Sequence, residues 1–141
     1  MKNTPDSPHN AAGKRTILAI DDDPSVASLL SAILGRRGYR IIAALDGRQG
    51  LAKAIEIKPH FITLDIMMPG MDGWTVLKEL KRINELKDIP VVILSVFDEK
   101  KLGYKLGAFD YLVKPFAMED LFSVVEKVET AMDAGEDGED I

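Results

Sequence analysis

The stretch that decides the fold is FITLDIMMPGMDG, residues 61–73. Residues 61–64 form a short apolar run suited to a buried strand, and the run stops at one carboxylate, Asp65. The loop that follows is rich in proline and glycine, which mark a turn. Because ligands of open parallel sheets bind at the carboxyl ends of strands, we expect Asp65 where a buried strand surfaces beside a ligand site.

The same strand-and-helix unit repeats five times along the chain. Short apolar runs predict strands at 16–20, 39–44, 61–64, 90–95 and 109–113. Segments with helical spacing of apolar residues follow them, the last with its apolar face over 121–132. Strand–helix alternation with near-continuous apolar strands predicts an α/β fold, a doubly wound five-stranded parallel sheet with helices on both faces.

Length and composition indicate one globular domain of 141 residues. We expect a flexible leader at 1–14, the domain at 15–132 and a flexible acidic tail at 133–141. The net charge of −5 argues against direct binding of nucleic acid by this domain. The chain has no cysteine, no signal-peptide pattern and no apolar run long enough for a membrane span, so a cytoplasmic protein is expected.

Polar side chains follow four of the expected strands. Asp21 and Asp22 come after the first strand and Asp65 after the third, while Ser95 closes the fourth and Lys114 follows the fifth. In a parallel sheet these ends share one edge, so the five side chains are predicted to converge. Three neighbouring carboxylates repel one another, and a hard divalent cation, Mg²⁺ or Mn²⁺, would offset that repulsion. A hydroxyl and an ammonium can hold further phosphoryl oxygens, so the group predicts phosphoryl-transfer chemistry, with an aspartate able to accept the phosphoryl group.

Each of these residues also has a plainer explanation when taken alone. Asp21 and Asp22 could be turn residues, Lys114 a solvated lysine and Ser95 a small residue at a strand end. Asp23 and Asp72 are predicted only to cap helices. The functional prediction therefore depends on the coincidence at one sheet edge.

The sequence resembles the receiver domain of two-component response regulators. The resemblance runs from about Lys14 to Ala131 and is carried by residues 17–24 (ILAIDDDP), 64–73 (LDIMMPGMDG), 94–95 (LS) and 110–116 (DYLVKPF). It implies a CheY-like, flavodoxin-like sheet with strand order 2-1-3-4-5. It also implies that Asp65 accepts a phosphoryl group from a histidine kinase or a histidine phosphotransfer protein.

The resemblance assigns a role to each matching residue. Asp21, Asp22, Asp65 and the backbone carbonyl of Met67 would hold Mg²⁺. Ser95 and Lys114 would bind the phosphoryl group, and Tyr111 would be the switch.

Two departures from the family pattern lead to specific expectations. Ser95 and Lys114 are 114 − 95 = 19 positions apart, about three fewer than usual in the family, so the fourth helix should be shorter by roughly one turn. Met67 and Phe97 are apolar at positions that flank the path of the hydrolytic water, so the acyl phosphate should be lost slowly. Val96 is bulkier than the usual residue and is expected to restrict how far Tyr111 turns inward.

The function expected is a phosphorylation-activated signalling switch, with self-catalysed phosphotransfer and autodephosphorylation but no metabolic substrate. Its downstream protein target is unknown, and the domain could instead be part of a hybrid sensor kinase or a multidomain regulator. A Mg²⁺-dependent aspartyl phosphatase is a competing prediction, but that chemistry needs an acid two residues after the nucleophile, where this chain has Met67. A nucleotide- or flavin-binding module is disfavoured because no glycine-rich loop follows the first strand.

Overall fold

The computed structural model describes residues 15–139 of the chain. The expected leader at 1–14 lies outside the described residues. The elements, in order, are β1 (Arg15–Ile20), α1 (Pro24–Leu34), a 3₁₀ turn η2 (Gly35–Arg37), β2 (Tyr39–Ala44), α2 (Gly47–Ile57), β3 (Phe61–Leu64), α3 (Gly73–Arg82), β4 (Val91–Ser95), α4 (Lys100–Lys105), β5 (Asp110–Val113) and α5 (Met118–Glu139).

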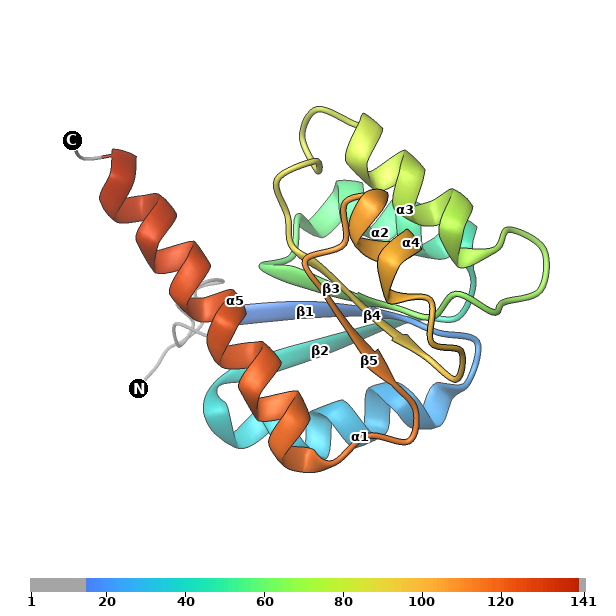
Figure 1. The fold of residues 1–141 in the computed structure, drawn as a ribbon, viewed down its shortest axis with the longest axis horizontal. Helices are drawn as coiled ribbons and strands as arrows, with labels where there is room; N and C mark the ends of the chain where they lie inside the picture. Colours follow the sequence, from blue (N-terminus) through green and yellow to red (C-terminus); the bar gives the residue numbers. More distant parts are fainter. Residues whose placement is uncertain (1–14, 140–141) are drawn as a thin grey trace.

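The strands form one parallel sheet in the order β2-β1-β3-β4-β5, which confirms the predicted fold. Figure 1 shows α1 and α5 on one face of this sheet and α2, α3 and α4 on the other. In this sheet β2 lies on one side of β1, and β3 and the later strands lie on the other, so the strand order reverses next to β1. Ligands of doubly wound sheets bind outside the carboxyl ends of the strands at such a reversal.

Two hydrophobic layers cover the two faces of the sheet, and alternate residues of each strand enter opposite layers. In β1, Ile17 and Ala19 pack with α1 and α5, whereas Leu18 and Ile20 pack with the helices of the other face. This double burial explains why the strands are mostly apolar.

Aspartates begin three of the helices, as the capping preference predicts. Backbone N–H groups donate to the side chains of Asp23 (from Ser25, 3.0 Å), Asp46 (from Gln49, 2.8 Å) and Asp72 (from Thr75, 2.9 Å). The roles of Asp23 and Asp72 as caps are thus confirmed, and neither belongs to the acidic cluster described below.

Helix α5 is longer than expected. It runs to Glu139, so most of the segment predicted as a flexible tail from 133 is helical, and the predicted boundary at 132 does not mark the end of the helix. An ion pair between Arg15 and Asp133 (3.4 Å) ties the first residue beyond that boundary to β1. A helix that is already anchored adds residues at little cost, which outweighs the unfavourable composition. Figure 1 shows this end of α5 extending past the edge of the sheet.

Helix α4 has only six residues, in agreement with the predicted shortening. Among residues 15–139, no helix is both long enough and apolar enough to span a bilayer.

Candidate functional site

The ends of β1 and β3 bring the three predicted carboxylates together. The N–H of Asp65 donates to the carbonyl of Ile20 (2.9 Å), and that of Asp21 donates to the carbonyl of Ala44 (3.0 Å). These bonds continue the strand ladder one residue beyond each strand, so Asp21 and Asp65 lie side by side. One carboxylate oxygen from each of Asp21, Asp22 and Asp65 lies within 4.8 Å of the other two.

Burial and pairing differ among the three carboxylates. Asp21 and Asp65 are buried, with 4% and 8% of their surfaces exposed, whereas Asp22 is exposed. One oxygen of Asp21 accepts the N–H of Asp23 (2.9 Å), and the other accepts the ammonium of Lys114 (2.8 Å). Lys114 is thus brought to the predicted edge, but in this structure its partner is Asp21.

The pKa of Asp65 is raised to about 6, first by burial and then by the negative charge of Asp21. Lys114 and the N–H of Met67, which donates to Asp65 Oδ1 (3.1 Å), partly oppose this rise. A carboxylate that is costly to ionise among other carboxylates is stabilised by a cation. The three residues offer hard oxygen ligands, which suit Mg²⁺ or Mn²⁺. The residues present therefore fit such an ion.

A close approach between α3 and the loop after β3 holds Asp65 in place. The N–H of Gly73 donates to the carbonyl of Ile66 (2.9 Å), and a Cβ at residue 73 would overlap the backbone of Asp65 and Ile66. The sequence indicated only a turn role for Gly73. The position of Gly73 directly after the capping Asp72 is the one sequence signal that could have suggested this contact. Gly70, by contrast, has a φ of +80° and does serve the turn.

Ser95 and Tyr111 are linked through the backbone of Phe97. Ser95 is fully buried, and its hydroxyl accepts the N–H of Phe97 (3.1 Å). The hydroxyl of Tyr111 donates to the carbonyl of the same residue (2.5 Å). Tyr111 is only 3% exposed in this structure, and the expected restriction of its inward turn by Val96 stays a prediction. Val96 itself is exposed.

The two residues predicted to tune hydrolysis lie on the surface. Met67 is 56% exposed and Phe97 is 49% exposed. Each follows a site residue, Asp65 or Ser95, by two positions, and its N–H donates to that residue's side chain. Met67 therefore lies beside Asp65 and Phe97 beside Ser95, while their effect on hydrolysis stays a prediction.

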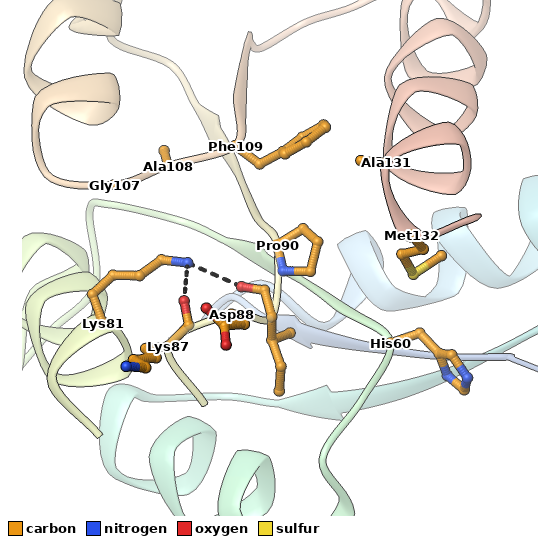
Figure 2. Close-up of a pocket in the computed structure, with 11 residues that line it drawn as sticks. His60, Lys81, Lys87, Asp88, Pro90, Gly107, Ala108, Phe109, Ala131 and Met132 are labelled. Carbon is orange, nitrogen blue, oxygen red and sulfur yellow. Dashed lines mark hydrogen bonds between the residues drawn. The ribbon is translucent and has the colours of Figure 1, made fainter. Parts of the chain in front are cut away.

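A groove of about 900 Å³ lies at the opposite end of the sheet, near the start of β4 and β5. Figure 2 shows Pro90 and Phe109 there, with Lys81 on one side and Met132 of α5 on the other. The Lys81 ammonium donates to the carbonyls of Lys87 and Ile89 (both 3.0 Å), and burial lowers its pKa. Lys81 therefore holds the connection between α3 and β4, and the groove shares no residue with the acidic cluster.

A smaller apolar hollow of about 380 Å³ lies directly beside the cluster. It is formed by α1, by Val96 after β4 and by residues 114–116 after β5. Lys114 lines both this hollow and the acidic site. A large group that reaches Asp65 would therefore meet an apolar surface next to the charged one.

Comparison with known proteins gives one consistent similarity. Residues 17–126 match the family model described as the response regulator receiver domain. The chain is 42% identical over 112 residues to the DNA-binding dual master transcriptional regulator RpaA of Synechocystis sp.. The aligned region covers 77% of this chain and 46% of RpaA. The chain thus spans about half the length of the curated relatives it matches.

Solved structures show the same likeness. The chemotaxis response regulator CheY4 of Vibrio cholerae is 33% identical, with a TM-score of 0.75 over 82% of this chain and 98% of CheY4. The receiver domain of sensor histidine kinase PA1611 from Pseudomonas aeruginosa PAO1 is 25% identical, with a TM-score of 0.72 over 81% of this chain and 96% of that one. That structure is described with a magnesium ion coordinated in the active site cleft.

Proposed function

The chain belongs to the response regulator receiver domain family, a family of phosphorylation-activated signalling domains, and on that premise we propose that Asp65 is the phosphoryl acceptor. The observation that carries the proposal is the clustering of Asp21, Asp22 and Asp65 at the carboxyl ends of β1 and β3. Lys114 pairs with Asp21, so Asp65 is the buried member of this cluster that forms no ion pair in the described structure, while Asp22 is exposed.

In the proposed reaction a carboxylate oxygen of Asp65 attacks the phosphorus of the donor. A bond forms between that oxygen and phosphorus, and the bond from phosphorus to the donor's nitrogen or oxygen breaks, with its electron pair leaving on the donor. The product is an acyl phosphate on Asp65. A bound Mg²⁺ would neutralise charge on the carboxylates and on the phosphoryl oxygens, and Asp21, Asp22, Asp65 and the Met67 carbonyl are the proposed ligands.

Ser95 and Lys114 are proposed to bind the phosphoryl group after transfer. Lys114 now pairs with Asp21, so that pair is expected to loosen as the ammonium turns toward the new charge. Ser95 now accepts from Phe97, whose carbonyl accepts from Tyr111. A shift of Ser95 toward the phosphoryl group would therefore be transmitted to Tyr111, the proposed switch.

Receiver domains interact with histidine kinases or histidine phosphotransfer proteins, and such a protein is the proposed donor. The apolar hollow beside Lys114, with exposed Leu29 and Val96 at its rim, supports contact with a protein surface close to Asp65. We place this domain in the cytoplasm and infer that it binds no nucleic acid itself, in line with its net charge of −5.

The downstream partner would differ between a stand-alone regulator, which the similarity to CheY4 favours, and a longer protein. The similarity to RpaA favours a multidomain transcriptional regulator, and the similarity to PA1611 favours a sensor kinase. In either case the signal would pass through the same phosphorylated Asp65.

Incubation with acetyl phosphate and Mg²⁺, followed by intact-protein mass spectrometry, tests the proposal. The wild-type protein should gain one phosphoryl group, Asp65→Asn should gain none, and the exposed control Asp88→Asn should behave as wild type. Continuous release of phosphate over many turnovers without accumulation of phosphoprotein would instead support the aspartyl phosphatase. A phosphoryl group retained in Asp65→Asn would overturn the assignment of the acceptor.

A further inference from the structure

The strand β2 lies at one edge of the sheet, where β1 is its only neighbouring strand. The carbonyl of Ala44 accepts the N–H of Asp21 (3.0 Å), so residue 44 directs its backbone groups toward β1. These groups alternate in direction along a strand, and those of residues 39, 41 and 43 therefore face away from the sheet. A row of outward-facing backbone groups is a template on which another strand can pair.

Two side chains of α2 bond the carboxyl end of this edge. The Lys53 ammonium donates to the carbonyl of Ala43 (2.7 Å), and the N–H of Leu45 donates to the side-chain oxygen of Gln49 (3.2 Å). Gln49 also belongs to the start of α2, because its own N–H donates to the capping Asp46 (2.8 Å). Lys53 lies well inside α2 and is no part of a cap, so its bond to the strand needs another explanation.

Lys53 bonds the strand rather than a carboxylate. Its ammonium forms no ion pair within residues 15–139. The side chain is half-buried, and its bond to Ala43 is short and charge-assisted. Over the same residues no side chain bonds the backbone of Tyr39 or Ile41, although Arg40 between them is exposed and adds a second cation to the edge. The edge is thus blocked at residue 43 and accessible before it.

A second copy of the chain that paired with this edge would need the backbone of residue 43. In an antiparallel two-fold arrangement centred on Ile41, each Ile41 faces its counterpart, and Tyr39 of each copy faces Ala43 of the other. The N–H of Tyr39 would then donate to the Ala43 carbonyl that Lys53 already bonds. Because the arrangement is symmetric, Lys53 would have to withdraw in both copies.

We propose that Lys53 prevents β2 from pairing with the β2 strand of a second copy of this chain. Pairing would cost each copy a charge-assisted hydrogen bond and would leave an ammonium beside the incoming strand. Lysine commonly protects edge strands in this way from a position on the strand itself, whereas here it reaches the edge from the neighbouring helix. The role is independent of the acidic cluster, since Lys53 bonds none of its residues.

Lys53→Met tests the proposal because it removes the ammonium and keeps the apolar stem. In sedimentation velocity over a range of concentrations, the variant should self-associate at least about tenfold more tightly than the wild type, since pairing no longer displaces the bond to Ala43. Lys53→Arg retains a donor and should sediment as the wild type does. Lys78→Met, at an exposed position of α3, controls for an added surface methionine and should also match the wild type. Failure of Lys53→Met to associate more tightly than Lys78→Met would overturn the proposal.

Amide exchange followed by NMR identifies the edge that is used. In Lys53→Met, exchange of the Ile41 and Ala43 N–H groups should slow as the protein concentration rises, while in the wild type it should not change with concentration. Association without protection of these two amides would place the contact elsewhere and refute the role of Lys53. Concentration-dependent protection of the same amides in the wild type would also refute it. Circular dichroism verifies folding, and Lys53→Ala repeats the comparison if Lys53→Met does not fold.

Discussion

Asp65 stands out at the scale of single residues because it is buried among like charges with no cation of its own in the described structure. Burial and the charge of Asp21 raise its pKa to about 6, close to the pH at which proteins work. The carboxylate must nevertheless be ionised to attack phosphorus. The charge repulsion that makes this state costly in the metal-free protein is what a bound cation would relieve.

This repulsion predicts a pH-dependent stability difference for Asp65→Asn. Because the folded-state pKa of Asp65 is raised above its ordinary value, the folded protein loses stability as the pH rises from about 4 through about 6. Without metal at about pH 7.5, Asp65→Asn should therefore raise the free energy of unfolding by roughly 1–3 kcal/mol. The gain should shrink as the pH falls through about 6 and vanish below about 4. Urea unfolding at both pH values, in the presence of a chelator, measures it, and a destabilised variant at the higher pH would contradict the electrostatic account.

The residues beside the site predict the lifetime of the phosphoryl group. Met67 and Phe97 are exposed and apolar, so neither can hold an attacking water. Phe97→Glu or Met67→Asn should therefore speed loss of the acyl phosphate by about tenfold, since a polar group there can orient water. The decay of purified phosphoprotein gives the rate, with exposed Met118→Asn as the control. Equal lifetimes in all four proteins would rule out this role.

The sequence was sufficient to predict which side chains meet at the sheet edge, because Asp21, Asp65 and Lys114 each follow an apolar strand and parallel strands end together. It could not predict that Lys114 pairs with Asp21, since that choice depends on distances between side chains. The contact of Gly73 with the Asp65 backbone was missed for a similar reason: a turn glycine and a close-approach glycine look the same in a sequence.

At the scale of elements, the start of α3 is predicted to be a critical contact. Gly73→Ala would force the helix away from the backbone of Asp65 and Ile66, and overpacking of this kind costs about 1–3 kcal/mol. Gly35→Ala is the matched control, because nothing lies within 4 Å of a Cβ there and the residue has helical φ of −58°. Denaturant unfolding should show a loss for Gly73→Ala and little change or a gain for Gly35→Ala. Similar values for the two would remove the close approach as the explanation.

Strands were predicted to within about one residue because each is a mostly apolar run between polar turns. The short α4 was also predicted, since a deletion in a helix shows directly as a changed spacing. The end of α5 was not, because its last turns carry glycine and acidic residues and are helical through continuity with an anchored helix.

At the scale of the whole molecule, α5 is fastened to the sheet by polar contacts along its length. The Arg37 guanidinium lies 4.4 Å from the ring centre of Phe122, the Tyr39 hydroxyl donates to Glu129 (2.6 Å), and Arg15 pairs with Asp133. These contacts tie α5 to the first two strands and to the turn before β2. The contacts therefore hold α5 against the domain as far as Asp133.

The bond from Tyr39 is the strongest candidate among these contacts, because it is short and charge-assisted. Tyr39→Phe should lower the free energy of unfolding by about 1–2 kcal/mol. It should also speed amide exchange in residues 126–134 more than in α3. Thermal or urea unfolding with peptide-level exchange measures both effects. An unchanged α5 would indicate that the hydrophobic face alone holds the helix.

The central claim, that Asp65 accepts the phosphoryl group, is tested most directly by trapping the acyl phosphate. Borohydride reduces an aspartyl phosphate to homoserine, so the protein is treated with acetyl phosphate and Mg²⁺, reduced, digested and mapped by mass spectrometry. Homoserine should be found at residue 65, and omission of Mg²⁺ should strongly reduce its yield. Homoserine at Asp21 or Asp22 instead, or unmodified Asp65 in protein that has gained a phosphoryl group, would contradict the account.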